Sequence, residues 1–412
     1  MQSVNQPAVE RHFRFFLAGQ GFLNLGESMR FIAVTMLIYK LTGSGVSAAA
    51  GVVFSSLPSI FTSPFAGVLG DRANEGRLMI LIDLARFVTV PLFLYARDIR
   101  FVYLLLILIS VLDVFYNPSR RKYVLGSTGR HNALRANSQL TGIGGAAYLA
   151  GPLLAGFLTD SRGAAPALVI SSLCCLFSGL MTLFSILAGG GSRDIAPADI
   201  YETGASAFRN CIKYCLDMPA IVELLAAGVI IGLCTISVNM SFYPFAFDVI
   251  KVTGRGWSLM ITIFYGTNLL AMALTRYLDR IYGIRDGRLF YSCLTVVSVI
   301  WLLYAFIRSY ALILLLQFIE GAFSAIAGII LASRFQMITG KQYMARVTGI
   351  NDVLSSAGKL AGMGCTALLL SKCSFLYVFI ACGILLFIFA SYRRIRPVWT
   401  GERSKHSFAS KI

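Results

Sequence analysis

Three acidic residues, Glu27, Asp113 and Glu320, lie within long apolar stretches of the sequence. Gln20, Asn24 and Glu27 stand at positions i, i+4 and i+7, so they share one face of a helix. An ionisable side chain inside a bilayer is costly, and such residues commonly carry protons, bind ions or bind substrate. These residue types therefore suggest proton transfer or substrate binding within a membrane.

Depth within the apolar stretches separates the three acids. At about 1.5 Å per helical residue, Glu27 lies roughly 21 Å into the first stretch and Glu320 roughly 15 Å into its own. Asp113 lies towards the end of a shorter stretch. We rank Glu27 and Glu320 as proton-coupling or substrate residues, with Arg30 one turn from Glu27 tuning its charge. The alternative is that each acid belongs to a structural ion pair.

Charged residues also cluster around the turn that follows the second apolar stretch. They are Asp71, Arg72, Arg77, Asp83 and Arg86. Asp71 can cap a helix N-terminus, where the macrodipole favours an anion. Asp83 and Arg86 form an i, i+3 pair on one helix. We expect all five to gate conformational change, with Asp113 first a partner of Arg72 or Arg77 and second a proton carrier.

The segment around Gly151 combines small residues with a helix-bending proline. Pro152 removes one intrahelical hydrogen bond. Gly151, Ala155 and Gly156 give a flat face that a neighbouring helix can approach closely. We therefore expect Gly151, Pro152 and Gly156 to serve helix packing.

Composition indicates which elements must position these residues. Of the 412 residues, 57% are hydrophobic and only 13% are charged, which is too few to cover the surfaces of soluble domains. A helix that spans a bilayer needs about 20 mostly apolar residues, so the chain has room for about twelve. We predict an all-α membrane protein with about twelve transmembrane helices. Basic cytoplasmic loops explain the net charge of +17 better than a nucleic-acid partner does.

The predicted spans form two sets of six. We expect an N-terminal half at 1–188, a cytoplasmic linker with a short amphipathic helix at 189–219, a C-terminal half at 220–392 and a basic cytoplasmic tail at 393–412. Most of the 36 Lys and Arg residues fall in the tails and in alternate loops, which places both termini in the cytoplasm. The predicted spans are 13–39, 46–70, 78–96, 101–118, 136–158, 166–188, 220–247, 257–278, 289–307, 310–333, 347–370 and 375–392.

The two halves resemble each other. The same spacing separates Arg77 from Arg288 and Arg135 from Arg346, and each of these residues marks a comparable turn or helix start. Duplicated six-span halves place a substrate site near the midplane between them.

Several kinds of chemistry have no matching pattern. The sequence lacks the glycine-rich Lys-Ser/Thr loop of ATP sites, so transport would use an ion gradient or run downhill. The nine cysteines and three histidines form neither a disulfide framework nor a metal pattern. We find no nucleophile–base arrangement. We therefore expect no enzyme activity, no metal and no cofactor.

The motifs together resemble those of the major facilitator superfamily. The Asp71 turn resembles its signature loop between spans 2 and 3, and Gly151-Pro152 resembles the signature of its exporters, with Ala147 and Ala155 where glycine is usual. More narrowly, the chain resembles the enterobactin-exporter and macrolide-efflux branch. The segments that carry this narrower likeness are Leu25-Gly26-Glu27, Leu41–Ser44, Pro58, Gly67–Arg72, Asp83–Arg86, Asn117-Pro118 and Arg135–Ser138.

The resemblance implies a function. It implies a bacterial inner-membrane exporter of a bulky amphiphilic small molecule, driven by proton antiport. Separately, we expect the protein to act as a monomer. In this superfamily spans 1, 4, 7 and 10 line the central cavity. In this sequence, those spans carry polar residues that share a helix face. The resemblance therefore adds three residues to the candidate substrate cavity. They are Asn239, Tyr243 and Gln317.

Two other functions stay open. A flippase for lysophospholipids or lipid precursors needs basic residues to meet a phosphate, and the predicted spans hold only Arg30, Arg86 and Lys359. A transport-dead sensor or assembly partner would carry a soluble domain, and the polar segments are too short for one. Both features disfavour these alternatives.

Overall fold

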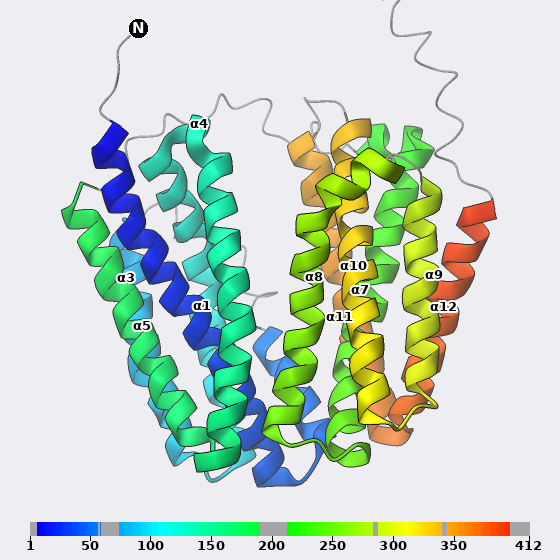
Figure 1. Cartoon of the computed structure of the whole chain (residues 1–412), viewed down its shortest axis with the longest axis horizontal. Coiled ribbons are helices and arrows are strands. Elements are labelled where there is room, and N and C mark those ends of the chain that lie inside the picture. Colours follow the sequence, from blue (N-terminus) through cyan, green and yellow to red (C-terminus); the bar gives the residue numbers. More distant parts are fainter. Residues whose placement is uncertain are drawn as a thin grey trace, which may run out of the picture. The chain divides into compact units, whose positions relative to one another are not determined.

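The computed structural model describes residues 6–56, 58, 74–189, 212–282, 287–339 and 344–395. The regular elements in these ranges are helices (Figure 1). A helix at Gly45–Ser56 follows the first of them. The labelled elements are α1 Gln6–Thr42, α3 Glu75–Thr89, η1 Val90–Tyr95, α4 Ile99–Arg162, α5 Ala164–Leu187, α7 Pro219–Pro244, η2 Phe245–Val249, α8 Gly254–Tyr282, α9 Gly287–Tyr304, α10 Tyr310–Ile338, α11 Met344–Lys372 and α12 Phe375–Ile395.

Within the described residues, ten helical stretches are long and apolar enough to cross a bilayer. Two further apolar helices, Gly45–Ser56 and Arg288–Tyr304, are shorter. Each coincides with one of the predicted spans, because hydropathy is a strong signal for helices of this length. Within the described residues, the prediction of an all-helical fold is thereby confirmed. The amphipathic helix predicted in the linker lies mostly outside the described residues.

Helix α4 differs from the prediction. The sequence suggests a loop between spans at 101–118 and 136–158, whereas the helix continues from Ile99 to Arg162. The first candidate span within it runs from Ile99 to Thr128. Arg120, Arg121 and Lys122 therefore belong to the helix, in keeping with the good helix propensity of arginine and lysine. Asp113 lies about midway along this longer stretch, rather than near its end.

The described residues fall into two compact units. The first comprises those of Met1–Ala198 together with Ala246–Tyr265. In it α1 packs on α4 and α5, and α3 packs on α5 and α4 (Figure 1). Its apolar core includes Phe16, Met79 and Tyr123. This packing brings the polar faces of α1, α3 and α4 together.

Two carboxylates hold the segment Ala246–Tyr265 within the first unit. Asp160, near the end of α4, accepts hydrogen bonds from the backbone N–H groups of Gly254 (2.7 Å) and Arg255 (3.0 Å). Asp248 accepts from the backbone N–H of Gly45 at 2.9 Å. Both carboxylates thus sit at helix N-termini, where unpaired N–H groups and the helix dipole favour an anion.

The second unit comprises the described residues of Asp199–Phe245 and Gly266–Ile412. In it α7 packs on α11, and α9 packs on α12 and α10. Aromatic rings fill the contact between α7, α9 and α12. The Phe242 ring centroid lies 5.1 Å from that of Tyr304 and 6.1 Å from that of Phe379. The ring of Tyr304 is thus packed against aromatic side chains of α7 and α12.

Candidate functional site

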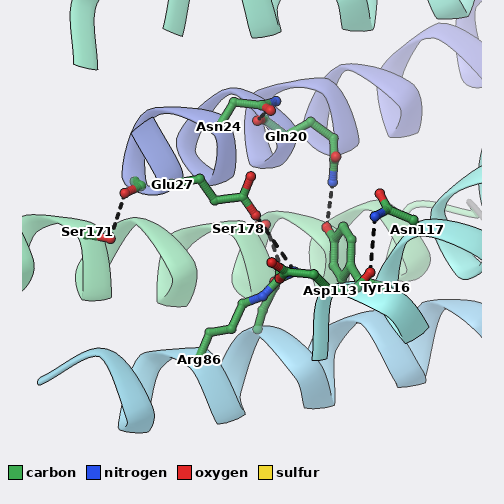
Figure 2. Close-up of polar contacts among 11 residues, drawn as sticks. Gln20, Asn24, Glu27, Arg86, Asp113, Tyr116, Asn117, Ser171 and Ser178 are labelled. Carbon is green, nitrogen blue, oxygen red and sulfur yellow. Dashed lines mark hydrogen bonds and ion pairs between the residues drawn. The ribbon is translucent and has the colours of Figure 1, made fainter. Parts of the chain in front are cut away.

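A buried arginine on α3 forms the centre of the candidate site. Arg86 is 1% exposed, and its guanidinium faces three carboxyl groups, of which Figure 2 labels Glu27 and Asp113. Nη1 lies 3.1 Å from Asp83 Oδ1, Nη2 lies 3.7 Å from Glu27 Oε1, and Nη2 also pairs with Asp113 Oδ1. One cation therefore links acids from α1, α3 and α4.

Neutral side chains complete the cluster. The Arg86 guanidinium carbon lies 4.5 Å from the centre of the Tyr116 ring, a distance at which a cation is attracted to the ring face. The Tyr116 hydroxyl accepts a hydrogen bond from Gln20 Nε2 at 2.7 Å. Ser178 on α5 donates to Asp83 Oδ2 at 2.8 Å. Figure 2 shows these residues converging from four helices.

Helical periodicity explains how each chain segment presents its residues. Asp83 and Arg86 are three apart on α3, and Asp113 and Tyr116 are three apart on α4, so each pair shares a face. On α1 the same face carries Gln20 and Glu27. Packing of α3 and α4 beside α1 and α5 then brings these faces together.

The cluster contains more acidic than basic groups, and its acids differ in their exposure to solvent. Three carboxyl groups share one guanidinium, and charges held away from water are stable only when they are paired. Asp83 is fully buried, whereas the side chains of Glu27 and Asp113 are 25% and 35% exposed. Glu27 and Asp113 are thus the acids of this cluster that can exchange protons with water.

The partner of Asp113 differs from the predicted one. The sequence favours Arg72 or Arg77 as the partner of Asp113, but its carboxylate pairs with Arg86. Arg77 is exposed, and its backbone N–H donates to the Asn74 side chain at the start of α3. Asp71 and Arg72 lie outside the described residues. Their predicted gating role therefore stays a prediction.

The remaining candidates on α1 lie around the same cluster. Glu27 has its ion pair with Arg86 rather than with Arg30. Arg30 is 9% exposed, and its Nη1 has no hydrogen-bond partner among the described residues. Asn24 donates from Nδ2 to the backbone oxygen of Gln20 at 2.6 Å.

Glu320 in the second unit has a different environment. Its Oε1 accepts from Trp301 Nε1 at 2.6 Å, and its Oε2 accepts from the Tyr304 hydroxyl at 2.7 Å. Both donors are neutral, and no described basic residue forms an ion pair with Glu320. Gln317 and Tyr243 are also buried, whereas Asn239 is exposed.

The predicted packing segment makes very close helix contacts. A Cβ atom on Gly151 would lie 1.9 Å from Ser28 Oγ on α1, and one on Gly156 would lie 2.2 Å from Ser258 Oγ. Any side chain at either position would therefore collide with its neighbour. Pro152 lies inside α4, which continues through it.

Sequence reasoning missed four polar partners: Tyr116, Ser178, Trp301 and Tyr304. Tyr116 follows Asp113 by three positions, and that spacing is a signal that could have identified it. The other three act across helix contacts, for which a single sequence contains no comparable signal.

Long apolar helices that bury a shared charge cluster define a polytopic membrane transporter as the class of protein. The chain belongs to the Major Facilitator Superfamily, whose family model matches residues 16–363. This confirms the family that the motifs suggest. It does not test the narrower enterobactin-exporter and macrolide-efflux branch.

Two relatives carry informative names. The uncharacterized MFS-type transporter YfiS of Bacillus subtilis (strain 168) is 21% identical over 388 residues, covering 90% of this chain and 89% of its own. The multidrug resistance protein MdtG of Rahnella sp. (strain Y9602) is 28% identical over 174 residues, covering 42% of this chain and 41% of its own. The second likeness is therefore partial.

Solved transporter structures share the fold. A bacterial homologue of the iron transporter ferroportin in an inward-facing state has a TM-score of 0.71 at 13% identity, covering 94% of this chain and 99% of its own. A bacterial homologue of the human lysosomal transporter Spinster has a TM-score of 0.70 at 10% identity, covering 95% and 97%. At these identities the likeness establishes the fold alone.

Proposed function

We propose that the protein is a secondary active exporter that moves a bulky amphiphilic small molecule, such as a drug, macrolide or siderophore, in exchange for protons. The observation that carries this proposal is the sharing of one guanidinium by three carboxyl groups in the first unit. The name of the partial Rahnella relative, a multidrug resistance protein, supports the efflux direction.

The proposal includes an arrangement in the membrane. We propose twelve spans in the bacterial inner membrane, with both termini in the cytoplasm and the protein acting as a monomer. The halves are 1–188 and 220–392, joined by the linker 189–219 and followed by the tail 393–412. Ten long and two shorter apolar helices support this span number, and bacterial relatives support the location.

The charge cluster supplies a physical basis for proton coupling. With all three acids ionised, Arg86 balances one negative charge, and the other two have only the more distant Arg30 and Arg120 nearby, which is costly in a largely buried setting. A proton taken up by Glu27 or Asp113 neutralises one of them. Glu27 is therefore our first candidate for the coupling acid, and Glu320 remains the second.

Protonation also changes which helices are linked. Glu27 ties α1 to α3 through Arg86, and Asp113 ties α4 to α3. A protonated Glu27 loses its charge attraction to Arg86, so the link between α1 and α3 weakens while the link through Asp113 remains. Release of the proton restores the first link. Proton binding can thus alternate the contacts of α1, as an antiporter requires.

The test compares two glutamates that differ in their partners. An accumulation screen of dyes, macrolides and siderophores in an efflux-deficient bacterial host first identifies an exported compound. That compound is then followed in proteoliposomes with an imposed pH gradient. We expect Glu27→Gln to lower uphill export at least tenfold while retaining binding that no longer varies with pH. Glu320→Gln is the matched control, and we expect its export to stay within a few-fold of wild type.

Either of two results would count against this assignment. If Glu27→Gln exports uphill at the normal rate and remains pH-sensitive, the coupling acid is elsewhere. If Glu320→Gln alone abolishes the pH dependence, Glu320 is the coupling acid, and Glu27 is a structural partner of Arg86.

A further inference from the structure

A pocket in the first unit lies beside the charge cluster and has a different chemistry. Its volume is about 310 Å³, and α1 and α4 form its walls. This is at the lower end of the range for small-molecule sites, roughly 300–1,000 Å³. The polar residues that line it are Asn24, Arg120, Arg121, Asn137, Thr141 and Tyr148.

The pocket is positively charged. Of the described residues that line it, two are arginines and none is acidic. Among the described residues, neither guanidinium forms a hydrogen bond or an ion pair with the protein. By contrast, the guanidinium of Arg86 already contacts three carboxyl groups of the protein. The guanidinium groups of Arg120 and Arg121 are thus available to a ligand.

The donors around the pocket suit an oxyanion. A guanidinium offers a planar fork of N–H groups that matches phosphate or carboxylate oxygens. The amides of Asn24 and Asn137 and the hydroxyl of Thr141 add neutral donors to this wall. A volume at the low end of the ligand range fits a charged headgroup better than an entire bulky amphiphile.

The length of α4 is what makes this pocket possible. The sequence suggests a loop after residue 118, which leaves the predicted spans with few basic residues. In the structure Arg120 and Arg121 are helical and lie towards the end of the candidate span Ile99–Thr128. They add to the few basic residues that a lipid-like substrate would need.

The pocket and the charge cluster share one helix face. Asn24 lines the pocket, and it lies one turn from both Gln20 and Glu27 on α1. Arg120 is also within electrostatic reach of Glu27. An anion held by Arg120 would therefore weaken the influence of that arginine on Glu27, which gives substrate and proton a physical means of sensing each other.

We propose that this pocket binds the phosphate or carboxylate group of the transported compound, which is therefore an anionic or zwitterionic amphiphile. The proposal rests on the exporter function proposed above and names its substrate class. It brings lipid-like headgroups back among the candidates alongside acidic drugs and siderophores.

The test measures binding to the purified full chain in a nonionic detergent, without any gradient. The probes are dodecyl phosphate, dodecyltrimethylammonium, which has the same tail and the opposite charge, and inorganic phosphate. We expect dodecyl phosphate to bind at least tenfold more tightly than dodecyltrimethylammonium. Arg120→Gln/Arg121→Gln should weaken dodecyl phosphate binding at least tenfold, and Arg120→Lys/Arg121→Lys should recover part of it.

The matched control is Arg100→Gln/Arg162→Gln. It removes the same charge from exposed arginines near the two ends of α4, and we expect wild-type affinity. A tenfold preference for dodecyl phosphate over inorganic phosphate assigns the pocket to an amphiphile headgroup, and equal affinity assigns it to a free anion. Both results retain the oxyanion site, provided that the double glutamine variant weakens binding.

The proposal is overturned if the two surfactants bind equally, or if the double glutamine variant binds like its control while its unfolding temperature is unchanged. These results are independent of the antiport test. Lost anion selectivity with intact proton-driven export rejects only the pocket. Intact selective binding in a protein that exports nothing rejects only the exporter function.

Discussion

Replacing Gly151 by alanine tests how closely α1 and α4 must approach. The new Cβ would lie 1.9 Å from Ser28 Oγ and 3.2 Å from the backbone oxygen of Leu25. The Ser28 hydroxyl can rotate away, but the Leu25 oxygen belongs to the helix backbone and cannot. Rotation also gives up the hydrogen bond from Ser28 to the Ala147 oxygen, which is 3.2 Å long.

The size of the effect follows from these contacts. Overpacking a tight contact costs about 1–3 kcal/mol, and losing one ordinary hydrogen bond costs about 0.5–1.5 kcal/mol. We expect Gly151→Ala to lower the unfolding free energy by about 1–3 kcal/mol, and Gly151→Leu to lower it further and to impair export. The measurement is the thermal unfolding midpoint of the detergent-purified protein, followed by export in proteoliposomes.

Gly142 provides the matched control on the same helix. No atom of the described residues lies within 4 Å of a Cβ built there, and alanine is favoured over glycine inside a helix by about 0.5–1 kcal/mol. Gly142→Ala should therefore be neutral or stabilising, and Gly142→Leu should export better than Gly151→Leu. The packing argument fails if the Gly142 and Gly151 variants unfold alike. It also fails if Ser28→Gly does not relieve Gly151→Ala.

Two further changes test the polar clusters through the unfolding midpoint. Arg86→Gln leaves the acids around it without a cation, so we expect the unfolding free energy to fall by about 3–5 kcal/mol at neutral pH. The decrease should be smaller at acidic pH, because protonated acids need no cation. Equal decreases at both pH values would contradict this. Trp301→Phe removes one of the two donors to Glu320 and should cost about 1–3 kcal/mol, whereas an unchanged midpoint would mean that the hydrogen bond is dispensable.

The fold was largely predictable because hydropathy and helical period act locally. Every apolar helix in the described part of the chain falls on a predicted span, and the motifs point to the superfamily that the family match then establishes. The exception is α4. A charged stretch after Pro118 resembles a loop in sequence, although arginine and lysine are good helix formers.

That one boundary explains the changed view of Asp113. Ending the span at residue 118 places Asp113 near the edge of the membrane, where Arg77 is a natural partner. The helical candidate span instead runs to Thr128, and Asp113, near its middle, pairs with Arg86. Periodicity predicts which residues share a helix face, but it contains no information on which face of a neighbouring helix they meet.

The two buried clusters differ in how readily their acids can change state. Glu320 has both oxygens bound by neutral donors, so moving it costs two hydrogen bonds and leaves no competing partner to gain. Glu27 shares Arg86 with Asp83 and Asp113. When one of these acids is protonated, the acids that remain ionised can therefore pair more strongly with Arg86. A buried charged group that exchanges one interaction partner for another loses less free energy than a group that loses a partner without replacement. An acid that must load and release a proton in every cycle is therefore better placed in the first cluster than in the second.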